Sequence, residues 1–151
     1  MGASQQQLQE LSEQLQAIQQ QIEVLNEEVE TVREDQQAVT EAIEAIEALE
    51  SDATVQVPLG GGAYVRATIE DIDELIVDVG ANYALERDQE GAVSTLENKR
   101  DRLDDRIDEL NDEITDLEGE SSQLENRAQQ LQQQAMQQQM QQMQGQQGPD
   151  E

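Results

Sequence analysis

Apolar residues recur at alternating spacings of three and four along the first third of the chain. With Leu8 at heptad position a, this rhythm continues to Ile46 without a phase break, and Gln36 is its one polar member. The a and d positions are Leu8, Leu11, Leu15, Ile18, Ile22, Leu25, Val29, Val32, Gln36, Val39, Ile43 and Ile46. A repeat sustained over this length is typical of a coiled-coil helix. We therefore expect a helix over residues 1–52.

The same rhythm returns in the second half of the chain, from Val93 to Ala135. Arg100 and Ser121 occupy two of its a positions, and the other a and d positions are aliphatic. This pattern predicts a second coiled-coil helix over residues 88–144. The glycines and the proline that follow favour a helix end, and we expect a disordered acidic tail over residues 145–151.

The two heptad series are complementary if the helices pack antiparallel, because a positions then face d positions throughout. The pairing sets Leu8 against Leu131, Leu15 against Leu124, Leu25 against Ile114, Val32 against Ile107 and Ile46 against Val93. Three layers are mixed: Gln36 meets Leu103, Val39 meets Arg100, and Ile18 meets Ser121. Polar residues in a seam weaken it but fix its register. A slip of one heptad stays open, because only these layers oppose it.

The period changes between the two helices, over residues 53–87. Residues 54–58 and 64–68 alternate like strands around the glycines of residues 60–62. Residues 75–79 and 83–87 form a second such pair around Gly80, Ala81 and Asn82. This pattern predicts two β-hairpins.

Two-stranded hairpins are marginally stable in water, and we expect these to find no large apolar partner within the chain. We therefore expect another subunit to complete their strands, which makes this segment an oligomerisation module. The residues expected to carry assembly are Val55, Val57, Leu59, Tyr64, Val65, Leu75, Val77, Val79, Tyr83 and Leu85. The alternative is a simple β-capped elbow on a monomer.

Composition and charge narrow the picture further. The chain has no Phe or Trp, which argues against a compact globular core. Its net charge is -27, and its acidic residues are spread along the sequence. Nucleic acids and anionic membrane surfaces repel such a chain, so neither is an expected partner. The charge favours a protein adapted to high salt, with a generically acidic coiled coil as the alternative.

Catalytic chemistry finds no support in the sequence. Without Cys or His there is no thiol or imidazole nucleophile and no zinc ligand set, and no spacing resembles a calcium loop. The glycines at 60–62 lack the Gly-Lys-Ser/Thr ending of a phosphate loop. We expect no enzyme activity, no catalytic residue, no cofactor and no metal. No signal peptide is visible at the N-terminus, so we expect the cytoplasm.

The free ends of the helices are the remaining candidates for function. Met136, Met140 and Met143 lie beyond the last paired layer and off the seam, and flexible thioether side chains suit surfaces that accept many shapes. Fraying of the same end would expose Leu8, Leu11 and Leu131. These six residues are the candidate client-binding site. The alternative is a frayed Gln-rich tail with incidental Met.

The order helix, two hairpins, helix resembles the alpha class of the archaeal prefoldin family. The resemblance lies in Val55–Ala67 and in Glu74–Arg87, and it extends over essentially the whole chain. The alpha class has two hairpins where the beta class has one. The sparse Lys and the spread acidity are similar to a halophilic version.

The resemblance implies a hexamer of two alpha and four beta subunits, with a β-barrel body from which the coiled coils project. It implies a chaperone that holds unfolded proteins at the coiled-coil tips without ATP and transfers them to a group II chaperonin. The competing function is a structural scaffold or spacer, which would need no four-strand assembly module between its helices.

Overall fold

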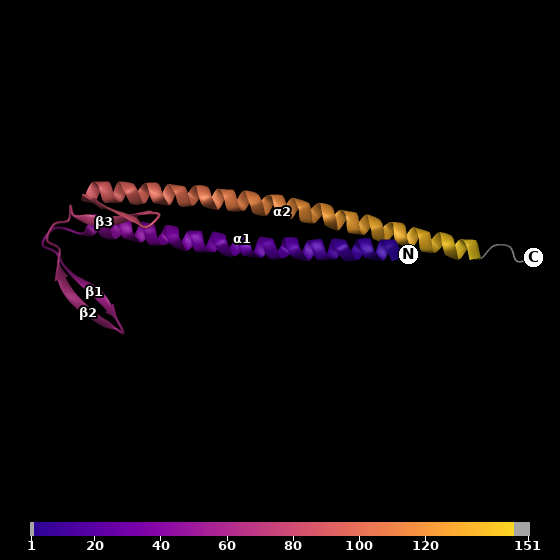
Figure 1. The fold of residues 1–151 in the computed structure, drawn as a ribbon, viewed down its shortest axis with the longest axis horizontal. Coiled ribbons are helices and arrows are strands. Elements are labelled where there is room, and N and C mark those ends of the chain that lie inside the picture. The colour runs from indigo at the N-terminus through magenta and orange to yellow at the C-terminus, as the bar shows by residue number, and fades with distance from the viewer. Residues whose placement is uncertain (1, 147–151) are drawn as a thin grey trace, which may run out of the picture. The chain divides into compact units, whose positions relative to one another are not determined.

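The computed structural model describes residues 2–146, which form two long helices and two hairpins (Figure 1). The helices are α1 (Gly2–Ala48) and α2 (Gln89–Gln146). The strands between them are β1 (Thr54–Gly60), β2 (Ala63–Thr68), β3 (Leu75–Gly80) and β4 (Tyr83–Arg87). The predicted mainly α architecture with two central hairpins is confirmed.

Both helices end elsewhere than predicted, and α1 ends at Ala48 rather than at residue 52. α2 includes Gly145 and Gln146, where we expected the tail to begin, and residues 147–151 lie outside the described part. A single exposed glycine lowers helix propensity by about 1 kcal/mol relative to Ala, which is too little to stop a long helix. The predicted tail is therefore wrong at its first two residues.

The chain divides into two compact units, each of which contains a segment of both helices. The first comprises Met1–Val29 and Glu109–Glu151, and the second comprises Glu30–Asp108. In the first unit the helices bury seam residues against each other: Leu11, Val29, Leu110 and Ile114. Leu110 is the most enclosed of these, with no exposed surface. The buried set coincides with predicted a and d positions.

Side-chain hydrogen bonds in the second unit report the register of the two helices. The Gln36 amide Nε2 donates to the backbone oxygen of Arg100, 3.3 Å away, and to the Asp104 carboxylate. These two acceptors flank Leu103, the residue predicted to face Gln36. A one-heptad slip would set Gln36 against Leu96 or Leu110 instead. The geometry therefore supports the predicted pairing and excludes the slip in this unit.

The polar layer extends one further turn. The Arg100 guanidinium donates through Nη1 to the Thr40 hydroxyl at 3.4 Å. Both side chains are half-buried, so Arg100 fills its seam position while its charged end reaches a polar atom of the opposite helix. Polar seam residues that are hydrogen-bonded across the interface disfavour other registers, because a slip would leave them buried without partners.

The main core of the second unit forms where the helices meet the second hairpin. Val39 and Ile43 of α1, Ala92 and Leu96 of α2, and Val77 of β3 are buried together. Further aliphatic side chains pack around them: Ala42, Ile46, Leu75, Val93 and Leu103. The expectation that the hairpins lack an apolar partner within the chain is therefore wrong for β3. Its alternating residues Leu75 and Val77 share one face, and the helices cover that face.

Local hydrogen bonds hold the two helix ends together at this core. The Gln89 side chain donates to the backbone oxygens of Ile46 and Leu49, at 2.8 and 3.1 Å, and so satisfies carbonyls at the end of α1. Asp88 caps α2, because its carboxylate accepts the backbone N–H of Gly91 at 2.7 Å. A Cβ at position 91 would lie 2.6 Å from that carboxylate oxygen, so any other residue there would force the Asp88 side chain to shift.

Both hairpins close at the predicted turns, through residues with positive φ. Gly61 and Gly62 join β1 to β2, and Ala81 and Asn82 join β3 to β4 with φ of 51° and 65°. Two central residues with positive φ match the twist of antiparallel strands. In the resulting registers, Val57 lies opposite Val65, and Val77 lies opposite Leu85.

Truncation of Leu110, the fully buried seam residue of the first unit, should lower the stability of the fold strongly. Leu110→Ala should lower the free energy of unfolding by about 2–5 kcal/mol, because it removes buried contacts and leaves a cavity. Val24→Ala, at a side chain that is 61% exposed, is the control and should change stability by about 0.5 kcal/mol or less. Urea unfolding followed by circular dichroism in molar KCl measures both. Equal midpoints for the two variants would contradict the packing of this seam.

Candidate functional site

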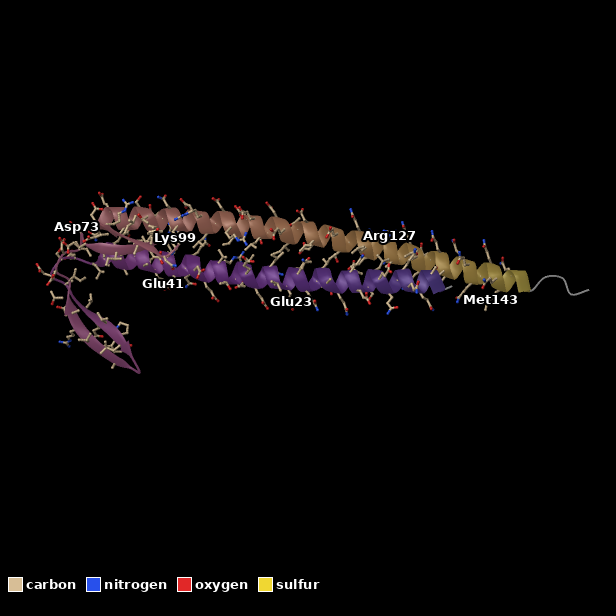
Figure 2. All side chains as sticks on the ribbon, in the orientation of Figure 1. Glu23, Glu41, Asp73, Lys99, Arg127 and Met143 are labelled. Atoms are coloured by element: carbon tan, nitrogen blue, oxygen red, sulfur yellow. The ribbon has the colours of Figure 1, made fainter. Side chains whose placement is uncertain are left out.

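The last turns of α2 present the first candidate surface. Met136, Met140 and Met143 are 68%, 69% and 72% exposed. Helical rotation of 100° per residue sets all three within about 60° of arc, so they form one apolar stripe. Figure 2 labels Met143, which projects from this end of α2. We call these three residues the methionine stripe.

The three candidate leucines have a different environment. Leu11 is buried, and Leu8 and Leu131 are half-buried. Leu8 and Ala135 line a small hollow of about 130 Å³ with Ser4 and neighbouring glutamines. Leu11 and Leu131 line another of about 160 Å³. In this conformation the leucines are part of the helix seam, and contact with a client would require the helix ends to open.

The first hairpin presents the second candidate surface. Val57, Leu59, Tyr64 and Val65 are exposed, and Val55 is half-buried. Because Val57 faces Val65 across the ladder, and Val55 faces Ala67, these four share one side of the hairpin. On that apolar side, Val57 and Val65 stay exposed among the described residues. Each strand also has one unpaired edge, and exposed edges of this kind are sites for pairing with another chain.

The second hairpin divides its predicted assembly residues between two environments. Val77 is buried and Leu75 and Val79 are half-buried, whereas Leu85 and Tyr83 are exposed. The chain's own core therefore occupies part of the surface that we assigned to assembly. What stays available on this hairpin is its open edges, its exposed tip and the outer face that carries Ile76, which is 79% exposed.

The structure adds a groove in the first unit that sequence reasoning missed. It has a volume of about 760 Å³, and Ala17, Val24, Leu25 and Leu117 supply its apolar lining. Three carboxylates lie along it: Glu113, Asp116 and Glu120. The signal in the sequence is the seven-residue spacing of Ala17 and Val24, which sets two apolar residues on one helix face beside the seam.

No grouping typical of an active site or a metal centre emerges in the described residues. Residues 2–146 contain no cluster of three or more acidic side chains arranged to hold a metal ion. Neither helix, over its described length, combines the length and apolar character needed to cross a membrane. The candidate surfaces are therefore apolar faces and strand edges rather than a catalytic pocket.

Comparison with known proteins identifies the family. The profile of the Prefoldin family, described as "Prefoldin subunit", matches residues 4–134, which include both hairpins and most of both helices. The chain belongs to the prefoldin family. The likeness inferred from Val55–Ala67 and Glu74–Arg87 is thereby confirmed.

Similar curated proteins include prefoldin alpha subunits from halophilic archaea. The one from Halorubrum lacusprofundi is 62% identical over 104 residues, which are 69% of this chain and 68% of that protein. The one from Haloquadratum walsbyi is 66% identical over 103 residues, 68% and 67% of the two chains. The one from Haloarcula marismortui is 69% identical over 64 residues, and this match covers 42% of each protein.

A solved structure supports the fold. The filamentous PFD from Methanocaldococcus jannaschii, determined by cryo-electron microscopy, covers 79% of this chain and 95% of its own, with a TM-score of 0.52. Its sequence identity is 24%, so it supports the fold alone. Taken with the family match, the function class is that of a chaperone-type prefoldin subunit, and prefoldins are a family of chaperones rather than of enzymes.

The charge of this prefoldin subunit predicts a dependence on salt. A net charge of -27 opposes the pairing of two acidic helices, and the Debye length falls from about 30 Å at 0.01 M salt to about 3 Å at 1 M. Helical content and the melting midpoint should therefore both rise with KCl and level off near 1 M. Circular dichroism of the purified chain measures both, with sucrose as the uncharged control. Equal midpoints at 0.01 M and 1 M KCl would contradict this reading.

Proposed function

We propose that the chain is an alpha subunit of a prefoldin hexamer that contains two alpha and four beta subunits. The supporting observation is the first hairpin, whose apolar face and strand edges are uncovered in the isolated chain. Open edges and exposed apolar faces are liabilities for a monomer, and closure into a barrel removes them. In this proposal the hairpins of the six subunits form a β-barrel body.

The proposed activity is to hold unfolded proteins at the coiled-coil ends, without ATP, and to deliver them to a group II chaperonin in the cytoplasm. The methionine stripe supports the holding step, because it offers exposed, adaptable apolar surface that contributes nothing to the seam. Each contact is weak, at about 25 cal/mol per Å² of apolar area buried. Several coiled coils that act on one client would raise the total affinity through avidity.

The test of this activity is aggregation of a chemically denatured client in molar KCl. We expect the chain with its beta partner to suppress light scattering by the aggregating client. This suppression should be the same with and without ATP. An assembled complex that leaves aggregation unchanged would favour the scaffold function instead.

Assembly should depend on the apolar face of the first hairpin. Val57→Asp combined with Val65→Asp places two carboxylates on directly opposite residues of that face, and like charges in this arrangement repel. We expect loss of the hexamer in native mass spectrometry, with helical content retained. Val24→Asp, on an exposed position of α1, is the matched control and should leave the complex mass unchanged. If the double variant still forms hexamers, the assembly surface must lie outside this face of the first hairpin.

Client holding should depend on the methionine stripe and be separable from folding. Changing Met136, Met140 and Met143 together to Gln should leave the melting midpoint within about 1 °C, because these exposed side chains pack against nothing in the seam. Protection of the denatured client should weaken several-fold. Unchanged protection would show that the stripe is passive, and would move the binding surface to Leu8, Leu11 and Leu131.

A further inference from the structure

The sulfur atoms of the described chain are confined to one short surface. The sequence has no Cys, and three of its four Met form the methionine stripe, while Met1 lies outside the described residues. The helix seams use Leu, Ile, Val and Ala at their apolar positions and contain no Met. The sequence also lacks Trp and His, which are other oxidation-sensitive side chains. Susceptibility to two-electron oxidants is therefore concentrated at the end of α2.

Each thioether of the methionine stripe is open to a small reagent. The three side chains are about two-thirds exposed or more, and uncharged glutamines separate them along the helix. Oxidation of a thioether depends on exposure, because the sulfur must meet the oxidant directly. The Met side chains also share one face, so oxidation changes one continuous surface rather than three scattered points.

We propose that Met136, Met140 and Met143 form a reversible oxidation site that switches client holding off. A sulfur lone pair attacks one oxygen of hydrogen peroxide, the O–O bond breaks, and a sulfur–oxygen bond forms. The sulfur is oxidised by two electrons to the sulfoxide, and the peroxide is reduced to water. Methionine sulfoxide reductase restores the thioether, with its thiols oxidised to a disulfide and the oxygen released as water.

This inference rests on the proposed client holding by the methionine stripe. A sulfoxide is polar and a strong hydrogen-bond acceptor, so it loses the apolar contact that the thioether offers. The seam is unaffected, because no residue of the stripe belongs to it. Oxidation therefore lowers affinity for unfolded protein while the helices and the hairpins stay folded.

The experiment uses the full chain, treated with hydrogen peroxide before it is reconstituted with its beta partner, so that only this subunit is oxidised. Catalase removes the peroxide before the client is added. Peptide mass mapping should find one added oxygen on each of Met136, Met140 and Met143. Suppression of client aggregation should fall to the level of the triple Met→Gln variant, with complex mass and helical content unchanged. Treatment with methionine sulfoxide reductases A and B should restore it.

A triple Met→Leu variant is the matched control, because it keeps the apolar surface and removes the sulfur. It should protect the client as well as the original chain does, and peroxide should not change that protection. Loss of protection by the oxidised Met→Leu variant would overturn the proposal, since the damage would lie elsewhere.

Comparing the oxidised, unsubstituted chain with the Met→Gln variant distinguishes failure of the proposed switch from failure of the proposed client holding. Full protection after oxidation of all three sulfurs, alongside a weak Met→Gln variant, would overturn the switch and leave client holding by the stripe intact. Full protection by the Met→Gln variant would overturn client holding by the stripe, and the switch with it.

Discussion

The seam between two antiparallel helices is the interaction on which the rest of the structure depends. It is narrow, because each helix contributes only its a and d positions. Those positions carry aliphatic side chains apart from Gln36, Arg100 and Ser121, and none of them is aromatic. Leu110 shows how completely a seam residue can be enclosed, whereas Val24, beside the seam, stays largely exposed. Two helices of this kind can bury a line of residues but cannot enclose a ligand-sized interior. Any further apolar surface must lie outside the seam.

Two of the apolar surfaces outside it have contrasting chemistry, and they lie in different parts of the sequence. One is the side of the first hairpin that carries Val57 and Val65, and the other is the methionine stripe of α2. The first is built from stiff β-branched residues on a regular ladder, which suits one fixed partner. The second is built from flexible thioethers on a helix, which suits many partners. The chemistry of the residues thus supports our proposal of one surface for assembly and another for clients.

The helices and hairpins follow from local signals, and the sequence was sufficient to predict them. The heptad rhythm predicted the seam, and strand-like alternation on either side of residues 60–62 and 80–82 predicted the hairpins. The sequence left a one-heptad slip open, and the hydrogen bonds of Gln36 exclude it in the second unit. Packing between elements was harder, because alternation along β3 shows that one side is apolar but does not say what covers it. Val77 therefore looked like an assembly residue until the structure placed it against Val39 and Leu96. The groove beside Val24 was missed for a related reason. Residues of both helices line it, and the sequence of neither helix alone is unusual there.

The distribution of residues between seam and surface also explains why we expect stability and the proposed client holding to vary independently. The seam depends on branched aliphatic side chains that resist oxidation and keep well-defined rotamers. A thioether in that position would make folding sensitive to the same reagents that modify the exposed end of α2, because oxidation would place a polar group in the core. Met136, Met140 and Met143 lie instead on an exposed surface outside the seam, which removes this coupling. A change in their polarity would then alter the proposed binding surface, while Leu110, Ile114 and the hydrogen bonds of Gln36 continue to hold the helices in register.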